Sequence, residues 1–398
     1  MATMKADELH DPPMPLDPPR PDSVPPLAST LVEAPSAPRP GRRVMGEAAL
    51  VISALATAAT LVLSVTIPPE RRLEARRLAA LVPAPPPPRT LAPDDEDEEP
   101  GTLAEQRARL FERMREDLGL SEMQIDAVRA VFDASPVLGQ GNPAISRHPM
   151  SRSECRRLRI EAGITEANVP ACGGPSMVPL YDPSSGQTAA DARVCMDQLE
   201  FPNVPCEYPV VHVRASEAAA LCRAVGKRIC DTHEWEGACA GAVRAPEVEY
   251  EWGRPRDEAT WYHNLEREKV WAYGAVKNHA LCGTASSRTP GCPGGGYDHC
   301  GSNTYPAGAF PACVSPLGVF DLHGNAAEHM NMPTLPGELA ARGGLGFTEM
   351  KGSWFVFSTI EAHEDDCRWR APSWHETRLT SESSHWNYHL GFRCCKDL

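Results

Sequence analysis

The stretch Val319-Phe-Asp-Leu-His-Gly-Asn-Ala-Ala-Glu328 decides the fold of this chain, together with two shorter segments, Lys351-Gly-Ser-Trp354 and Leu390-Gly-Phe-Arg-Cys394. In the longest segment two carboxylates bracket a glycine turn, and backbone carbonyls are available between them. Beyond residue 140 the chain around these segments is rich in Gly, Pro and aromatic residues and has few long periodic stretches. This pattern predicts a domain dominated by loops and short strands.

Two helices interrupt the loops. The first is expected from Ser216 to the stop at Gly226, and the second begins at Thr232, whose hydroxyl can cap it. Short strands are expected near residues 193–195, 355–357 and 391–395. Helices set among short strands indicate the α+β class.

A helical hairpin is expected before this domain, over residues 101–135. Leucine and methionine recur at spacings of seven and four from Leu103 to Leu118, and Gly119 ends the repeat. Ser121-Glu-Met-Gln124 then forms a capping box that opens a second helix, which ends at Pro136. We expect the hairpin to be a packing element or stalk, with a partner-binding surface as the alternative.

The first hundred residues do not have the composition of a folded core. The chain contains 40 prolines, and tracts such as Pro85–Pro88 crowd this region. Such tracts favour extended polyproline II. We therefore expect a disordered tail over residues 1–47 and a Pro-rich, acidic linker over residues 68–100, where the run Asp94–Glu99 indicates a solvated segment.

Between tail and linker, residues 48–67 form an apolar run without a charge. A run of about 20 such residues matches the hydrocarbon core of a bilayer, which predicts one transmembrane helix. A buried core helix is the alternative, but the flanking segments offer no domain to bury it. The numbers of arginines on the two sides of the run are nearly balanced. They slightly favour a cytoplasmic C-terminal side, which is opposite to the orientation that the cysteines indicate.

Cysteine usage indicates the compartment. All 14 cysteines fall after residue 150 and are scattered rather than grouped in zinc-type pairs, which is typical of disulfides formed in an oxidising space. We therefore expect a single-pass inner-membrane protein with a cytoplasmic tail and a periplasmic C-terminal domain. The formal charge of −14 argues against nucleic acid as a partner.

Six sequence blocks in order resemble the formylglycine-generating enzymes, the sulfatase-modifying factor family. Besides the three segments quoted above, the resemblance rests on Met196–Asn203, Pro209–Val213 and the run from Leu221 through Gly226-Lys-Arg228 to Thr232-His-Glu-Trp-Glu236. The blocks cover residues 190–398, within a domain expected over residues 140–398. The resemblance implies the C-type-lectin-like α+β fold of that family, with little regular structure.

The resemblance also implies a calcium site. Asp321, Gly324, Ala326 and Glu328 match the family's calcium-binding segment, with Asp in place of the Asn often found first. Hard oxygen ligands on a tight loop suit Ca²⁺. The alternative is a turn held by Asp and Asn side-chain hydrogen bonds.

The family's copper site is not complete in this sequence. The resemblance implies two cysteines that hold Cu(I), and their positions carry Val356 and Asp366, with Cys367 one place late. The Trp and Asn of two further family positions are Ala327 and His389. We therefore do not expect copper. If the chain is active nonetheless, the candidate catalytic residues that remain are Cys367, Ser353 and Arg368.

The remaining thiols have a structural interpretation in the family. The resemblance implies a disulfide between Cys222 and Cys394, and a second one between Cys239 and Cys367. The pairing of the other ten cysteines stays open.

Histidines gather in the last quarter of the chain, and with nearby carboxylates they could form a non-haem iron site. The family includes iron-dependent relatives, but the resemblance implies that their metal motif, of HxxxH type, belongs to a separate N-terminal helical domain, and we expect no such domain in this chain. Scattered surface histidines are the favoured interpretation, and the histidines concerned are His323, His329, His363, His375, His385 and His389.

Two functions follow from these observations. The first is a membrane-anchored, extracytoplasmic binding or accessory module, stabilised by calcium, that engages a peptide, glycan or protein. The second is an oxidase that converts a sulfatase cysteine to formylglycine, which only the resemblance supports. An iron-dependent oxygenase is more distant.

Overall fold

The computed structural model describes residues 97–292, 294–341, 346–372, 377–381 and 384–398. They fall within one unit, Ala92–Leu398. The predicted tail, the predicted membrane helix over 48–67 and nearly all of the predicted linker lie outside the described residues. Among the helices that are described, none is long and apolar enough to span a bilayer.

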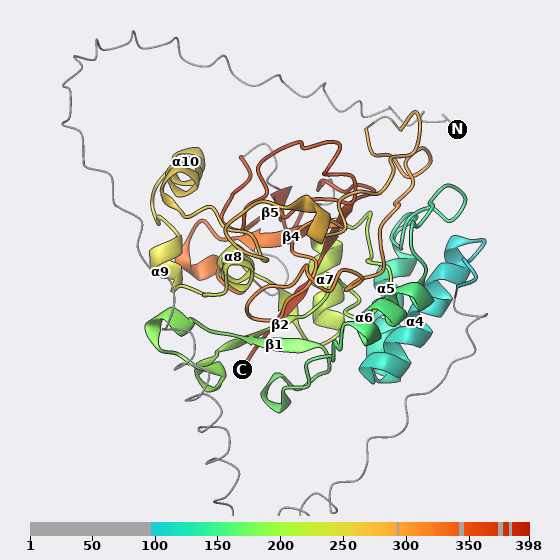
Figure 1. Cartoon of the computed structure of the whole chain (residues 1–398), viewed down its shortest axis with the longest axis horizontal. Coiled ribbons are helices and arrows are strands. Elements are labelled where there is room, and N and C mark those ends of the chain that lie inside the picture. Colours follow the sequence, from blue (N-terminus) through green and yellow to red (C-terminus); the bar gives the residue numbers. More distant parts are fainter. Residues whose placement is uncertain (1–96, 293, 342–345, 373–376, 382–383) are drawn as a thin grey trace, which may run out of the picture. The chain divides into compact units, whose positions relative to one another are not determined.

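The helical hairpin consists of α4 (Leu103–Leu118) and α5 (Glu122–Asp133). Both helices begin with a capping box, at Thr102 and at Ser121, and α4 ends at Gly119 with a φ of 66°. The apolar faces bury side chains such as Met114 and Phe132 in a core shared with α7 (Ala215–Ala224), beside which the hairpin lies in Figure 1. The hairpin is therefore packed onto the domain.

The strands of the domain form two small sheets. The first has the order β1-β2-β8-β3 and is antiparallel throughout; its strands are Met177–Leu180, Val194–Asp197, Cys394–Asp397 and Arg228–Ile229. The second has the order β6-β5-β4-β7, with β4 parallel to β7; its strands are Thr377–Arg378, Phe347–Lys351, Ala327–Met332 and Leu390–Phe392. Because β7 and β8 are separated by one residue, Arg393, the chain passes there from one sheet to the other.

Four further helices lie around the sheets: α6 (Arg152–Glu161), α8 (Thr232–Ala240), α9 (Pro246–Glu249) and α10 (Arg256–Glu266). Helix α8 begins where expected, but Asp231 is its N-cap, and the Thr232 hydroxyl instead donates to the Asn331 carbonyl at 3.1 Å. Helices with two short sheets place the domain in the α+β class.

The strand expected over residues 355–357 is wrong. This segment is a turn in which the Phe357 amide donates to the Trp354 carbonyl at 3.0 Å. Phe355, Val356 and Phe357 are all buried, with at most 1% of their surface exposed. A short apolar run is compatible with any fully buried conformation, and here the core surrounds a turn.

All fourteen cysteines are joined in seven disulfides, and none is free. The structure joins Cys222 to Cys394 and Cys239 to Cys367, the two pairs that the family resemblance implies. The other five are Cys155–Cys206, Cys172–Cys195, Cys230–Cys395, Cys282–Cys313 and Cys292–Cys300. These bonds hold together long segments without regular hydrogen-bond ladders.

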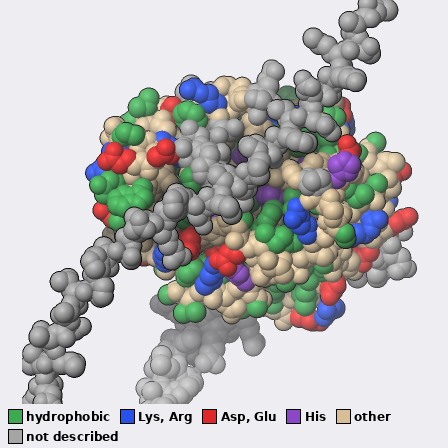
Figure 2. Space-filling model, turned by 90° about the horizontal axis from the view of Figure 1, so that it is seen from above, with side chains coloured by type: hydrophobic (Ala, Val, Ile, Leu, Met, Phe, Trp, Pro, Cys, Tyr) green, Lys and Arg blue, Asp and Glu red, His purple; other side chains and the backbone are tan. Residues whose placement is uncertain are grey.

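One face of the domain carries side chains of mixed charge. On the face seen in Figure 2, acidic and basic side chains are interspersed with apolar ones, without a broad field of either sign.

Candidate functional site

The strand register brings together the three sequence segments that decide the fold. On β4, Glu328 lies opposite Lys351 of β5 on one side and opposite Gly391 of β7 on the other. The loop 319–326 leads into β4, and Arg393 follows β7 directly. Residues far apart in the sequence therefore form one buried centre.

A buried ion pair lies at this centre. The Arg393 guanidinium donates to both oxygens of Glu328, at 2.5 and 2.7 Å, and the Trp235 indole N–H donates to Glu328 Oε2 at 2.9 Å. Arg393 also donates to the carbonyls of Phe320 and Asp197, at 3.0 and 3.2 Å. Both charged side chains are at most 1% exposed. Charge-assisted bonds of this kind are strong when they are sealed from water.

Two more carboxylates lie close to this ion pair. Asp321 accepts a hydrogen bond from the Gly308 amide, and Glu200 accepts from the Asn325 side chain and the Ala326 amide at 2.6 and 2.8 Å. Burial raises the pKa of Asp321 to about 6. Burial, together with the neighbouring charges of Asp321 and Glu328, raises the pKa of Glu200 well above its usual range.

The backbone of this loop is fixed by unusual conformations. Asp321 and Asn325 both have a φ of 57°, and Gly324 has a φ of 78°. A Cβ on Gly324 would lie 2.7 Å from the Gly283 backbone, so only glycine fits. The turn geometry expected from the sequence thus has a packing reason.

The predicted calcium ligands fit a protein ion pair better than a calcium ion. Glu328 already receives three N–H donors on its two oxygens, and Arg393 supplies the positive charge. Asp321 is engaged with the Gly308 amide. Calcium would need these same carboxylate oxygens. Protein donors therefore already occupy these oxygens, and the function proposed below uses no calcium ion.

The positions that should hold copper offer no thiolate. Val356 is 1% exposed and packs in an apolar cluster with Phe355 and Tyr388. Asp366 accepts a hydrogen bond from the Arg368 amide at 3.0 Å. The sulfur of Cys367 is bonded to Cys239 at 2.02 Å. The donor set does not fit Cu(I), which binds soft sulfur ligands.

Ser353 belongs to a buried hydrogen-bond cluster. Its hydroxyl donates to Asp365 Oδ2 at 3.1 Å and accepts from the Gly324 amide at 2.9 Å, while Trp271 donates to Asp365 Oδ1 at 3.1 Å. Burial alone would raise the pKa of Asp365, but His323, whose Nδ1 lies 3.8 Å from Oδ2, and the hydrogen bond from Trp271 hold it below its usual range. The serine proton is therefore directed at a carboxylate that stays ionised.

His323 separates this cluster from the disulfide. Its Nε2 accepts from the Ala272 amide at 3.0 Å and lies 3.3 Å from the Cys239 sulfur. The Ser353 hydroxyl donates to Asp365, and the other nitrogen of His323, Nδ1, lies 3.8 Å from the same carboxylate oxygen. The expected catalytic candidates Ser353 and Cys367 thus act in the structure as hydrogen-bonding and cross-linking residues.

Arg368, the third candidate, belongs to a second buried network with Arg370. Arg370 donates to both oxygens of Glu236 at 2.8 and 3.1 Å, and Arg368 lies 3.4 Å from Glu249. Lys351 adds a contact of 3.1 Å to Glu236. Both glutamates are 0% exposed. Burial alone would raise the pKa of Glu236, but Arg370 and Lys351 hold it well below its usual range.

Three groups of possible metal ligands occur among the described residues: Cys239-His323-Cys367, Cys230-Glu234-Cys395 and Glu236-Glu249-His263. The first two rely on sulfurs that are already in disulfides. In the third, cationic side chains contact both carboxylates. None of the three therefore offers free anionic ligands to an ion.

The alternative of a two-histidine, one-carboxylate iron site does not assemble among the described residues. The favoured interpretation as surface histidines is wrong for His323, His329 and His389, which are buried. His329 contacts the Val213 carbonyl at 3.1 Å, while His363 stacks on Trp369 with 4.5 Å between ring centroids. His375 lies outside the described residues.

Several residues of the buried centre were missed by sequence reasoning. Glu200 and Trp235 stand inside two of the sequence blocks that resemble the family. Their position in these blocks could have identified them as residues of the centre. Glu249 stands in no block, and an acidic residue outside a motif is usually a surface residue.

Comparisons with known proteins bear on the family. A family model described as "Sulfatase-modifying factor enzyme 1-like domain" matches residues 145–398. No curated protein matches the chain. A solved structure described as "Crystal Structure of CarF" aligns with a TM-score of 0.31 and 12% identity, over 56% of this chain and 93% of that chain.

Proposed function

Because this chain belongs to the family of the sulfatase-modifying factor enzyme 1-like domain, we propose that it is a binding or accessory module of that family without copper oxidase activity. The module lies outside the cytoplasmic membrane and is tethered by the apolar run over residues 48–67. Its partner is a peptide, glycan or protein.

One observation carries the proposal: every cysteine is in a disulfide. A copper oxidase of this family needs two thiolates, whereas this chain has a buried valine at one position and a carboxylate at the other. The nearest sulfur, that of Cys367, is bonded to Cys239 and is 0% exposed. Forming a copper site would require breaking a buried disulfide and replacing a core residue.

The buried centre has a different role under this proposal. Arg393, Glu328 and Trp235 join the two sheets, and the Ser353–Asp365 cluster fixes the loop next to the Cys239–Cys367 disulfide. These contacts make the centre rigid and dry. Such a centre supports a recognition surface rather than a reacting one.

The extracytoplasmic location rests on the same disulfides. Seven disulfides persist in an oxidising compartment and are rare in the cytosol. Labelling of an intact cell with a membrane-impermeant reagent at an engineered surface cysteine tests this location. Labelling only after lysis would contradict it.

The activity is tested with the purified full-length chain. The protein is incubated with Cu(I), oxygen and a peptide that contains the Cys-x-Pro-x-Arg target implied by the family, and the peptide is analysed by mass spectrometry for the aldehyde. We expect no aldehyde above the level of a Cys367→Ser variant. Aldehyde formed by the unaltered chain and lost in Cys367→Ser would refute the proposal and establish the oxidase.

A further inference from the structure

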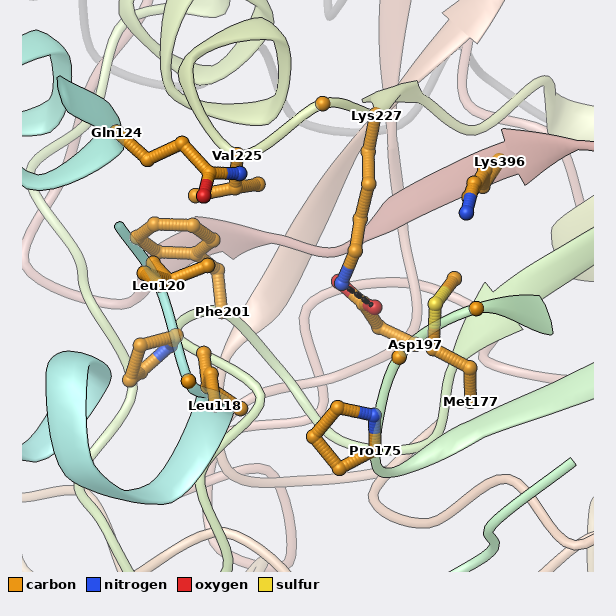
Figure 3. A pocket seen from close by; sticks show the side chains of 15 residues that line it. Leu118, Leu120, Gln124, Pro175, Met177, Asp197, Phe201, Val225, Lys227 and Lys396 are labelled. Carbon is orange, nitrogen blue, oxygen red and sulfur yellow. Dashed lines mark hydrogen bonds and ion pairs between the residues drawn. The ribbon is translucent and has the colours of Figure 1, made fainter. Parts of the chain in front are cut away.

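A pocket lies between the helical hairpin and the family domain. Its cavity volume is about 170 Å³, and its wall combines the turn between α4 and α5 with the end of α7, the loop before β1 and strand β8. Figure 3 shows its labelled side chains converging from these elements. The hairpin residues precede position 145, where the family match begins. The pocket is therefore formed where the hairpin contacts the domain, and the family match covers only one of its two sides.

One side of the pocket is apolar. Leu118 and Leu120 from the hairpin turn face Phe201 and Val225 from the domain (Figure 3). A dry apolar cavity of about 150 Å³ is large enough to hold a benzene ring. The pocket therefore has room for one aromatic or branched aliphatic group.

The other side of the pocket carries charge. Lys227 forms an ion pair with Asp197, a carboxylate that is 0% exposed, so these two charges offset each other. The Lys396 ammonium donates to the Cys172 carbonyl at 3.0 Å, and no carboxylate among the described residues forms an ion pair with it. An ammonium has three donors, so two remain for a ligand.

A second hollow adjoins the first and shares its lysines. It is lined by Gly226, Lys227 and Lys396, and also by Arg223, Arg228 and Asp397. Arg228 is paired with Glu234 and Asp397, at 2.6 and 2.8 Å. Lys396 and the exposed Arg223 thus leave a positive local charge in a chain whose formal charge is −14.

We propose that this pocket binds an apolar carboxylate, with its anionic group on the Lys396 ammonium and its apolar body between the hairpin turn and Phe201. The ligand is either a small organic acid or the C-terminal residue of a peptide, because both present the same chemistry. Binding at this seam would hold the hairpin against the domain. Such a ligand would bind whether or not the chain holds copper.

The test uses the full-length chain and calorimetric titration with 3-phenylpropanoate and, as the uncharged match, 3-phenylpropanamide. We expect the acid to bind about tenfold more tightly than the amide, since a charge-assisted hydrogen bond is lost. Lys396→Met should weaken acid binding by about tenfold while leaving the amide unchanged. The matched control is Lys269→Met, at a lysine that does not line the pocket.

A second variant tests the apolar part. Gly174 lines the pocket, and a Cβ there would meet only the Met177 sulfur, at 3.6 Å. The Cβ of Gly174→Leu is therefore accommodated, and the rest of the side chain should occupy the pocket, so that the variant, with its fold checked by melting temperature, binds neither ligand. A tetrapeptide ending in phenylalanine, with a free or amidated terminus, distinguishes the two sources: tighter binding of the free peptide than of the small acid indicates a peptide terminus.

Three results would overturn the proposal: equal affinity for acid and amide, unchanged acid binding by Lys396→Met, or no saturable binding of acid or free peptide up to about 20 mM, where even a weak small-molecule site would fill.

Discussion

Two neighbouring disulfides should stabilise the domain in a non-additive way. Cys222–Cys394 and Cys230–Cys395 connect the same two segments, because their cysteines are near neighbours at both ends. When one bond is removed, the other still holds the segments, so the loop that is opened spans only about nine residues. If a disulfide stabilises by restricting the unfolded chain, closing a loop of this length adds about 2.6 kcal/mol to the free energy of unfolding.

Removing both bonds opens a longer loop. The next connection between the segments is Cys239–Cys367, so the second bond to be lost closes a loop of about 40 residues, worth about 3.9 kcal/mol. Each single removal should therefore cost about 2.6 kcal/mol, and the joint removal about 6.5 kcal/mol. The joint loss exceeds the sum of the single losses by about 1.3 kcal/mol.

The assay is urea unfolding under non-reducing conditions of three variants: Cys222→Ala with Cys394→Ala, Cys230→Ala with Cys395→Ala, and all four together. Comparing the four proteins as a cycle removes the cost of the cavity at each site. Single losses near 5 kcal/mol, the value for an isolated loop of about 170 residues, would refute the reasoning, as would strict additivity.

Three other perturbations and a metal test have defined outcomes. Arg393→Met should lower the free energy of unfolding by about 3–5 kcal/mol, because it leaves the buried Glu328 unpaired, and adding Glu328→Gln should recover part of the loss in the same urea assay. Burial lowers the pKa of His263 and of His329 to about 4. The unfolded chain takes up both protons from about pH 6.5 downward, which lowers stability, whereas the folded Asp321, with its pKa raised to about 6, takes up a proton in the same range and opposes this loss. The two histidines are therefore tested against a His263→Gln, His329→Gln double variant: between pH 6.5 and 4 the stability of the unaltered chain should fall more steeply than that of the variant, by at most about 2.7 kcal/mol per pH unit, and equal slopes of urea midpoint against pH would contradict it. Phe132→Ala should cost about 3–5 kcal/mol and increase hydrogen exchange throughout the hairpin, whereas unchanged exchange would mean that the hairpin is not docked. Adding calcium or a chelator should leave the melting temperature unchanged, and a rise of several degrees at millimolar calcium would restore the calcium site.

The family and the fold class could be predicted because they depend on residues with local or ordered signals. Capping boxes and glycine stops mark the hairpin, and short blocks in a fixed order mark the domain. The pairs Cys222–Cys394 and Cys239–Cys367 were implied by the family resemblance that these blocks carry. These features do not require knowledge of distant contacts.

The buried networks could not be predicted in the same way. Glu236 and Glu249 are charged residues with 0% exposure. The cost of burying them is offset by ion pairs with Arg370 and Arg368, which are more than 100 residues away in the sequence. The turn at residues 355–357 differs from the predicted strand for a related reason. A short apolar run indicates that a segment is buried, but it does not indicate whether the segment is a strand, a helix or a turn.

The central claim is that this member of the family has no thiol with which to hold copper. It is tested most directly by unfolding the purified full-length chain without reductant in the presence of an alkylating reagent, followed by peptide mapping. We predict that none of the fourteen cysteines is alkylated. Alkylation of Cys367 and Cys239 in most molecules would contradict the account, because it would return a pair of thiols to the site from which the oxidase chemistry is excluded.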